Sequence, residues 1–307
     1  MKLHFIVNPV AKNGIAMKTW GKLKKQLEKR NMNYEERFTS QPGDGEAFAR
    51  QIASETNDEA VIIAVGGDGT ANEVIHGING HPKGVAGFIP AGSGNDFCRG
   101  YHLPRNPKKA LEFIINSSRD KKYKKYDNGR YHISHKSGIF VNNLGCGFDA
   151  LVAKSANESI LKPILNRIFL GKLVYVYSLL KELVKFKPSK LTVEIDGKVL
   201  EFHKTWFVTI CNHPYFGGGM KISPDSKPDD QQFEVVIVHD VSKLKIMLLF
   251  ITVFWGQHTR LKEVSFFTGR NILIKNEAKF PVHADGDHIG YESVDVKLQE
   301  EFVTLLS

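Results

Sequence analysis

The sequence predicts two domains, an N-terminal α/β domain with a parallel sheet and a second domain that is mostly antiparallel β. Three observations support this fold class. Continuous apolar runs alternate with helical spacing up to about residue 125, strand-like segments dominate afterwards, and a charged stretch lies between the two patterns. With 307 residues, of which 42% are hydrophobic, the chain can bury two cores of ordinary size.

The first domain is predicted to span residues 1–125. Short apolar runs in this part suit strands that are buried on both faces of a sheet. Helical spacing separates them, and Pro107 suits the first turn of a helix. The predicted strands are Leu3–Val7, Ala60–Val65 and Val85–Ile89, and the predicted helices are Trp20–Lys29 and Pro107–Asn116.

The second domain is predicted to span residues 126–289, after the charged stretch Arg119–Arg130. Asp196-Gly197 is a hairpin signal between two of its strands. We expect one helix within 160–187, one within 243–255, and a final strand at Phe302–Leu306, so that about 290–307 is a candidate to complete the first domain. The predicted strands are Leu191–Ile195, Val199–Phe202, Trp206–Ile210, Phe233–Val238 and Asn271–Ile274.

Composition restricts the function classes. The formal charge of +9 favours anionic partners, and the three cysteines form no CxxC pair, so neither a zinc site nor a disulfide framework is indicated. The apolar start is too short for a signal-peptide core, and the run Ile246–Gly256 is shorter than the roughly 20 residues of a membrane-spanning helix. We expect a cytoplasmic protein that is at most peripheral to the membrane.

The segment Gly66–Glu73 follows a predicted buried strand and precedes helical spacing. Glycine lets the backbone approach a phosphate, and a helix N-terminus favours its negative charge. Asp68 would repel a phosphate unless Mg²⁺ lies between them, which indicates a metal-bridged nucleotide. The alternative is a tight strand-to-helix turn capped by Asp68 or Thr70.

Two further segments leave predicted strands in the same way. Pro90–Phe97 carries small residues, a hydroxyl and a carboxylate, and Asn8–Gly14 follows the first strand. The carboxyl ends of parallel strands meet at one edge of a sheet, so these segments are expected to converge with Gly66–Glu73 on one ligand. Taken singly, each is an ordinary turn about as often as a site.

The segments GGDGTANEV at Gly66–Val74 and GSGNDF at Gly92–Phe97 resemble the diacylglycerol kinase catalytic domain, which sphingosine kinases and related bacterial lipid kinases share. The resemblance runs through nearly the whole chain, including Lys221–Asp230 and Asp285-Gly286-Asp287. It implies an NAD kinase/diacylglycerol kinase-like ATP-binding domain followed by a β-sandwich lipid-substrate domain. The implied activity is ATP- and Mg²⁺-dependent phosphorylation of the hydroxyl of diacylglycerol or a related lipid.

The resemblance also implies roles for individual residues. Asp68 and Asp96 would belong to the network around Mg²⁺ and the transferred phosphate, and Lys12 stands where the family usually has Gly. A structural Mg²⁺ would be held by Asp225 with the carbonyls of Ile222 and Lys227, although Pro224-Asp225 is as readily a plain turn. The implied ATP site consists of Asn8, Pro9, Val10, Ala11, Lys12, Thr39, Gly66, Gly67, Asp68, Gly69, Thr70, Ala71, Asn72, Glu73, Gly92, Ser93 and Asn95.

Asp285 is the expected proton acceptor for the lipid hydroxyl, because the family pattern there is Asp-Gly-Glu with the first carboxylate as base. Asp287 replaces the usual Glu, so its supporting role is the less secure of the two. The tripeptide could also be a plain turn. His283 and His288 flank it, and we expect both to be solvated or hydrogen-bonded rather than metal ligands.

The segment 154–190 carries eight basic and two acidic residues among many apolar ones. Such a segment suits a helix on an anionic membrane surface, but an ordinary amphipathic helix packed on the β domain is slightly favoured. A homodimer is an expectation from related bacterial enzymes, and a monomer stays open.

Two other functions compete with the lipid kinase. An NAD kinase-like enzyme would use the same Asp-bearing glycine segment, and a non-catalytic binding protein for anionic ligands or membranes would retain only the fold. Nucleic acid is not an expected partner, because no RRM, KH or zinc-finger signature is present.

Overall fold

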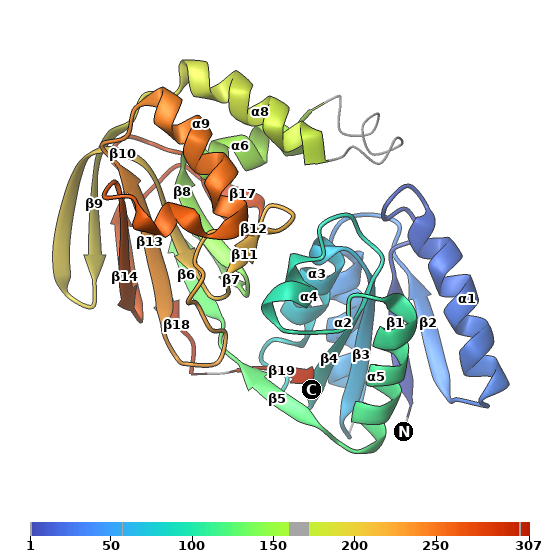
Figure 1. Ribbon diagram of the computed structural model, residues 1–307. Coiled ribbons are helices and arrows are strands. Elements are labelled where there is room, and N and C mark those ends of the chain that lie inside the picture. Colours follow the sequence, from blue (N-terminus) through green and yellow to red (C-terminus); the bar gives the residue numbers. More distant parts are fainter. Residues whose placement is uncertain (1, 57, 160–171, 301) are drawn as a thin grey trace. The chain divides into compact units, whose positions relative to one another are not determined.

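The computed structural model describes residues 2–56, 58–159, 172–300 and 302–307. The chain divides into two compact units, Met1–Tyr126 together with Glu301–Ser307, and Asp127–Glu300. We call them unit 1 and unit 2 and describe each by itself (Figure 1). The predicted fold class is confirmed, because unit 1 is α/β with a parallel sheet and unit 2 is mostly antiparallel β.

Unit 1 is built on a sheet with the strand order β2-β1-β3-β4-β19-β5, in which β5 is antiparallel to β19 and the other pairs are parallel. The strands are β1 (Leu3–Val7), β2 (Tyr34–Phe38), β3 (Ala60–Gly66), β4 (Gly84–Pro90), β5 (Tyr123–Tyr126) and β19 (Val303–Leu306). The helices are α1 (Ile15–Lys29), α2 (Asp44–Glu55), α3 (Asp68–Ile78), α4 (Asp96–Gly100) and α5 (Pro107–Arg119).

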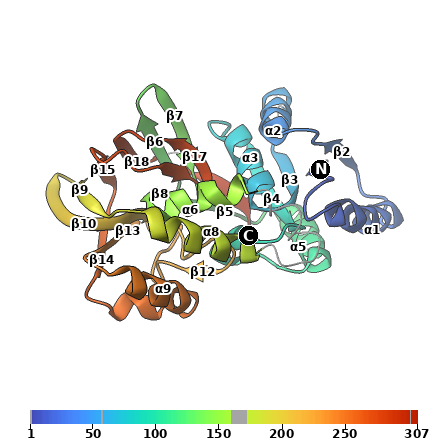
Figure 2. The ribbon, with the colours of Figure 1, turned by 90° about the horizontal axis from the view of Figure 1, so that it is seen from above.

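Helices cover both faces of this sheet, which is why β1, β3 and β4 are continuous apolar runs (Figure 2). Trp20, Leu23 and Leu27 of α1 pack on one face together with α5. The final strand β19 lies between β4 and β5, so the end of the chain completes the sheet of unit 1. The carboxyl ends of β1, β3 and β4 therefore lie at one edge of the sheet.

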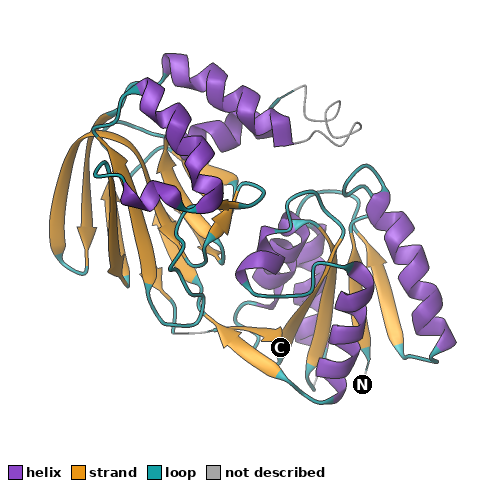
Figure 3. Cartoon of the chain, in the orientation of Figure 1, coloured by secondary structure: helices purple, strands orange, loops and turns teal. Residues whose placement is uncertain are grey.

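Unit 2 contains a large antiparallel sheet, whose strands are drawn in orange in Figure 3. Its strand order is β17-β16-β8-β10-β9-β15-β18-β6-β7, with β13 pairing β10 and β14. Its strands are β6 (Gly129–Ile133), β7 (Lys136–Phe140), β8 (Asn143–Gly147), β9 (Ser189–Ile195), β10 (Lys198–Cys211), β13 (Phe233–His239), β14 (Val264–Gly269), β15 (Asn271–Lys275), β16 (Val282–Ala284), β17 (Asp287–Gly290) and β18 (Val294–Leu298). A small separate ribbon is formed by β11 (Tyr215–Phe216) and β12 (Met220–Lys221).

One strand, β10, joins the two layers of the unit 2 sandwich. Its first half pairs with β9, its second half lies between β8 and β13, and the register with β9 shifts between Phe202 and Thr205. The prediction of two separate strands in this region was wrong, because a bulge lets a single strand bend and change partners.

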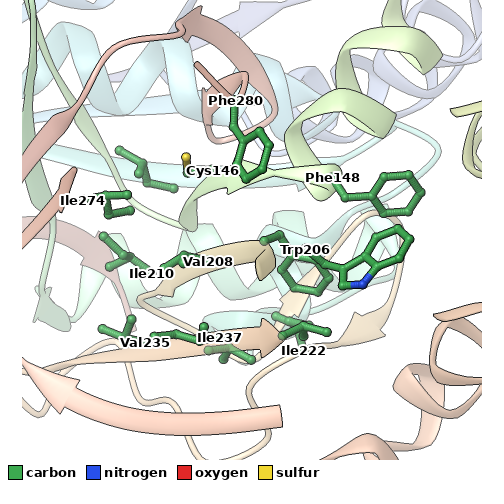
Figure 4. Close-up of a cluster of buried hydrophobic side chains, with 14 of the residues drawn as sticks. Cys146, Phe148, Trp206, Val208, Ile210, Ile222, Val235, Ile237, Ile274 and Phe280 are labelled. Atoms are coloured by element: carbon green, nitrogen blue, oxygen red, sulfur yellow. The ribbon is translucent and has the colours of Figure 1, made fainter. Parts of the chain in front are cut away.

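The helices of unit 2 are α6 (Phe148–Asn157), α8 (Lys172–Lys185), α9 (Lys243–Thr252) and the 3-10 turns η1 (Val253–Trp255) and η2 (Gln257–Arg260). Those at α8 and α9 match predicted helices, whereas α6 was not predicted. Figure 4 shows part of the buried core of unit 2, with Phe148, Trp206 and Phe280 among its large side chains. Among the described residues, no helix is both long enough and apolar enough to cross a bilayer.

Candidate functional site

The first glycine segment is a direct junction between a strand and a helix. Strand β3 runs to Gly66, and α3 begins at Asp68 after an extended Gly67. Asp68, Gly69 and Thr70 are therefore the first turn of a helix. The Thr70 side chain folds back on the strand, since a Cβ on Gly66 would lie 2.3 Å from the Thr70 Oγ1.

The second glycine segment packs directly against the first. The Ala91 amide donates to the Gly66 carbonyl at 2.7 Å, and a Cβ on Gly92 would lie 2.4 Å from the Gly67 Cα. Only glycine at position 92 permits this approach of two backbones. The two segments are thereby held in contact at the carboxyl ends of neighbouring strands.

Asp68 joins these segments through its carboxylate, which accepts a hydrogen bond from the Phe97 amide at 2.9 Å. Burial raises the pKa of Asp68, and backbone amides from Phe97, Asp96 and Asn95 oppose this rise. The Asp96 carboxylate accepts from the Arg99 guanidinium at 2.5 Å, and Arg99 also donates to the Gly94 carbonyl. Both carboxylates expected near Mg²⁺ thus have protein partners.

The third segment begins at Asn8 and is tied to the first. The Asn8 Oδ1 accepts from the Val10 and Ala11 amides at 3.2 Å and 3.1 Å, and its Nδ2 donates to the Thr70 Oγ1 at 3.4 Å. Lys12 has a left-handed backbone with φ 49 and an exposed side chain. Pro9 and Gly14 lie in the same turn before α1.

Two other predicted ATP-site residues have structural contacts. Thr39 is buried after β2, and its amide donates to the Val7 carbonyl at 3.0 Å. The Glu73 carboxylate accepts from the amides of Gly43 and Gly45 at 2.9 Å and 3.0 Å, so it caps the start of α2. Ala71 and Asn72 are buried on α3, whereas Ser93 and Gly69 are exposed.

Three segments from β1, β3 and β4 therefore meet at one edge of the unit 1 sheet, as the sequence predicts from parallel strands (Figure 1). The N-terminus of α3 has Gly67 as its N-cap, a residue without a side chain that could accept a hydrogen bond from the first-turn amides. Free amide groups at a helix N-terminus bind anions well. This edge of the sheet can therefore hold a phosphate group.

Unit 2 holds the predicted base in a tight turn between β16 and β17. Asp285 has a left-handed backbone with φ 50, and its amide donates to the Asn143 carbonyl at 2.8 Å. Its carboxylate accepts from the amides of Val141, Asn142 and Asn143 at 2.9, 2.8 and 3.0 Å. These donors fix the carboxylate and stabilise its ionised form.

A buried pair supports this turn from inside the domain. The Gly286 amide donates to His283 Nδ1 at 3.2 Å, which assigns the ring proton to Nε2. That nitrogen lies 3.7 Å from the Asp149 Oδ2, which accepts from the Thr209 Oγ1 at 2.8 Å. The side chains of His283 and Asp149 are only 3% and 4% exposed. His283 is thus hydrogen-bonded through Nδ1, which is one of the two states expected from the sequence.

Asp149 was missed by sequence reasoning, although Gly145 and Gly147 just before it were a usable signal. A Cβ on Gly145 would lie 2.1 Å from the Asp149 Oδ2 and 2.5 Å from the His283 Nε2. Gly145 of β8 is therefore needed as glycine, because a side chain there would occupy the space of Asp149 and His283.

Asp287 is exposed at the start of β17. Burial raises the pKa of Tyr131, and the negative charges of Asp285 and Asp287 raise it further. The two carboxylates and this phenol thus share one electrostatic neighbourhood. The Asn157 Nδ2 of α6 donates to the Gly286 carbonyl at 3.1 Å and holds the turn from another side.

The predicted structural metal site lies in the turn before β13. Asp225 and Lys227 are exposed, and the Ile222 carbonyl accepts from the His258 Nε2 at 2.8 Å. Burial lowers the pKa of His258, which suits a neutral donor at this contact. Within the described part of the chain, no three His, Cys, Asp or Glu side chains gather as a metal-binding group.

A depression of about 510 Å³ lies elsewhere on unit 2, and no predicted site residue lines it. Its walls include Asp196, Lys198, Glu234 and Phe267. The candidate site is therefore defined by hydrogen-bonded turns and strand ends, not by this hollow.

Two family models match most of this chain. The model for the diacylglycerol kinase catalytic domain matches residues 2–124, and the model for the YegS C-terminal NAD kinase beta sandwich-like domain matches residues 142–307. The Bacillus subtilis (strain 168) protein named "Putative lipid kinase YtlR" is 35% identical over 295 residues, covering 93% of each chain. The chain belongs to the diacylglycerol kinase family.

One further relative and two solved structures are similar to this chain, the structures at a level that shows a shared fold. The diacylglycerol kinase of Staphylococcus carnosus (strain TM300) is 26% identical over 290 residues, covering 94% of this chain and 89% of the relative. A crystal structure titled as a putative diacylglycerol kinase from Bacillus anthracis str. Sterne has a TM-score of 0.77 at 22% identity, covering 99% of this chain and 94% of that one. An NAD kinase from Archaeoglobus fulgidus in complex with ATP shares the fold, with a TM-score of 0.54 at 12% identity, covering 100% of this chain and 94% of that one.

Proposed function

We propose that this diacylglycerol kinase family member transfers the γ-phosphoryl group of ATP to the hydroxyl of diacylglycerol or a related lipid, with Mg²⁺ as the companion of the nucleotide. The observation that carries the proposal is the convergence of three strand-end segments around the open N-terminus of α3. The Archaeoglobus NAD kinase with this fold is titled as a complex with ATP, which supports ATP as the donor.

The donor end of the reaction is assigned to unit 1. The first-turn amides of α3 face the edge where the Gly66 and Gly92 segments meet, and such amides suit the charge of a phosphate chain. Thr70 keeps its hydroxyl near Asn8, where it would orient a phosphate oxygen. The exposed Lys12 side chain adds a positive charge beside this edge.

The residues present fit a phosphate better than they fit a tightly held metal. Mg²⁺ prefers oxygen ligands in octahedral geometry, often through several waters. Asp68 and Asp96 are the proposed contributors, but Asp68 is engaged with the Phe97 amide and Asp96 with Arg99. A metal carried by ATP would offset charge on the phosphoryl oxygens. The proposed role of Asp68 and Asp96 is limited to holding this metal. The Asp225 site likewise stays a proposal.

The acceptor end is assigned to the Asp285 turn. A lipid hydroxyl that attacks the γ-phosphorus loses its proton, and a carboxylate is the suitable acceptor. Three backbone amides hold and orient the Asp285 carboxylate before the reaction, while Asp287 adds a second carboxylate nearby. The new phosphorus–oxygen bond forms on the lipid oxygen as the bond to ADP breaks, and Asp285 takes the proton.

The test is a transfer assay with radiolabelled Mg-ATP and a panel of acceptors in detergent micelles. The panel contains a diacylglycerol, a monoacylglycerol, a sphingoid base and NAD. Transfer to at least one lipid is expected. Transfer to NAD alone would replace the lipid kinase by an NAD kinase-like enzyme. ATP binding without any transfer would favour a non-catalytic binding protein.

A further inference from the structure

Helix α9 and the η1 turn after it present a row of large apolar side chains to the surface of unit 2. Only Ile246 and Leu249 of α9 are buried, and Val253 continues this inner face in η1. The outer residues, which we call the α9 apolar face, are Leu244 (70% exposed), Met247 (39%), Leu248 (58%), Ile251 (55%), Phe254 (39%) and Trp255 (69%).

The sequence spacing of these residues makes the exposed face continuous. Leu244, Leu248 and Ile251 recur at intervals of three and four residues, which places them on one side of a helix. The helix is thus apolar on its inner and its outer side. Helices of this kind are normally covered, and a contiguous exposed apolar patch commonly marks a binding surface.

The sequence segment that carries the α9 apolar face has charges of one sign. From Lys243 to Lys262 the sequence contains four basic residues and no Asp or Glu. Lys243 donates to the Val184 carbonyl of α8 at 2.6 Å, and Lys245 pairs with Glu263. Arg260 and Lys262 are exposed after η1.

The adjoining end of α8 has the same character. Val184 is 75% exposed, and the neighbouring Lys185 and Lys187 are exposed as well. Opposite them, Leu179, Leu183 and Phe186 pack into the unit 2 core. This agrees with the favoured expectation that the segment packs on the β domain, while residues 160–171 of the same predicted segment lie outside the described residues.

We propose that the α9 apolar face docks into the interface of an anionic phospholipid bilayer. The charge pattern argues for this occupant over a second copy of the chain. A two-fold dimer through the face would bring each basic rim against its own copy, whereas an anionic bilayer attracts it. Trp255 stands at the end of the face, and tryptophan is enriched where proteins meet the headgroup region.

This docking surface rests on the proposed function, because it identifies how the enzyme reaches a lipid acceptor. An amphipathic helix lies in the plane of the interface with its apolar side among the acyl chains. The apolar residues would supply the insertion, and the basic residues the preference for anionic headgroups.

The experiment is vesicle sedimentation of the full chain without ATP, with phosphatidylcholine vesicles and with vesicles that also contain phosphatidylglycerol. We expect preferential binding to the anionic vesicles, weakened by salt, and a loss of about tenfold or more in partitioning for Leu248→Glu. Val199→Glu is the matched control, since Val199 is 54% exposed in the same unit, away from the α9 apolar face. It should bind as the wild type does.

Tryptophan emission gives a second readout. Trp20 and Trp206 are each 1% exposed, so a blue shift on vesicle addition would report on Trp255, and Trp255→Phe should abolish it. Wild-type protein that stays in the supernatant, or Leu248→Glu that binds as strongly as wild type, would overturn the proposal. A dimer in sedimentation equilibrium that Leu248→Glu dissociates, without vesicle binding, would assign the face to a second copy.

Failure of the docking surface and failure of the kinase function are distinguishable. Phosphorylation of lipid in detergent micelles does not require a bilayer, so Leu248→Glu should keep micellar activity while losing vesicle binding. If the wild type binds vesicles but transfers no phosphate in micelles, the docking surface is supported and the lipid kinase function is excluded.

Discussion

Asp68 in unit 1 and Asp285 in unit 2 each carry a carboxylate that accepts backbone amides from a segment distant in the sequence. Asp68 holds Phe97 of the second glycine segment, and Asp285 holds Val141, Asn142 and Asn143. Asp68 stands in the first turn of a helix, and burial is the main influence on its pKa. Asp285 stands in a left-handed turn that a buried pair supports from below.

The two environments indicate two different roles for these carboxylates, which the sequence motifs alone do not distinguish. Asp68 brings together the segments that would hold ATP, so we regard it first as a positioning residue. Asp285 is fixed by amides, and the exposed Asp287 follows closely in the same turn. Asp285 is therefore better suited than Asp68 to contact a substrate hydroxyl. The predictions below test this division of labour.

The largest expected effect is that of Asp285→Asn on transfer. The amide is nearly the same size but cannot accept the hydroxyl proton, so kcat should fall by about 100-fold to 10,000-fold. The measurement is phosphate transfer to the best lipid acceptor in micelles. Asp295→Asn is the control, because this carboxylate of the same unit pairs with Lys297 at 3.7 Å and belongs to no predicted site. Wild-type turnover in Asp285→Asn would remove the base assignment.

Weakening the buried support of the base should have the next largest effect. In Asp149→Asn, the partner of His283 Nε2 loses its charge, and the Asp285-Gly286 turn is less firmly held. We expect kcat to fall by about 10-fold to 100-fold, with the KM for ATP unchanged. Steady-state kinetics in ATP and in lipid separate the two parameters. An equal rise in the KM for ATP would place Asp149 outside the support of the base.

Removal of the Asp68 carboxylate should reduce stability as well as activity. In Asp68→Ala the Phe97 amide loses its acceptor, so the free energy of unfolding should drop by about 1–3 kcal/mol. The KM for ATP should rise, because the second glycine segment loses one of the contacts that hold it against the first. Urea unfolding and kinetics measure both, with the exposed Asp58→Ala as control. Unchanged stability would show that Asp68 does not hold the Gly92–Phe97 segment.

Acid should weaken unit 2 through His213. Burial lowers the pKa of His213 to about 3. The His213 Nε2 lies 2.7 Å from the side-chain Oδ1 of Asn142, and the backbone amide of Asn142 donates to Asp285. The neutral ring is favoured in the fold, while the unfolded chain binds a proton below its ordinary pKa of about 6.5. Stability should therefore fall as the pH drops from about 6.5 toward 3, by up to about 1.4 kcal/mol per pH unit.

Urea unfolding at several pH values measures this slope, and His213→Gln should reduce it. Asp68 works in the opposite direction in unit 1, because its raised pKa favours the fold at low pH and loses that contribution as the pH rises above about 3.8. An identical slope in His213→Gln would show that other groups cause the acid sensitivity.

Much of this fold follows from local patterns in the sequence. The strands β1, β3 and β4 are apolar throughout because both faces of their sheet are covered, and Asp196-Gly197 forms the expected turn with φ values of 47 and 83. The convergence of three segments at one sheet edge followed from parallel strands alone. These features depend on residues that are close in sequence or on general sheet geometry.

The remaining features depend on contacts between distant residues, which one sequence does not reveal. Glu73 lies in the glycine motif but caps α2, and the partners of Asp285 lie more than a hundred positions before it. Asp149 is an isolated carboxylate in the sequence, and its role becomes visible only in the structure, where it lies beside His283. The bend of β10 cannot be predicted without its partners, because the strand pairs with β9 in its first half and with β8 and β13 in its second half.

The most direct test of the division between Asp68 and Asp285 measures ATP binding and phosphate transfer on the same preparations. Calorimetry of ATP binding is combined with transfer to lipid in micelles for wild type, Asp68→Ala and Asp285→Asn. We predict that Asp285→Asn binds ATP as the wild type does and transfers almost nothing, whereas Asp68→Ala binds ATP more weakly. Lost ATP binding in Asp285→Asn together with wild-type binding in Asp68→Ala would contradict the account.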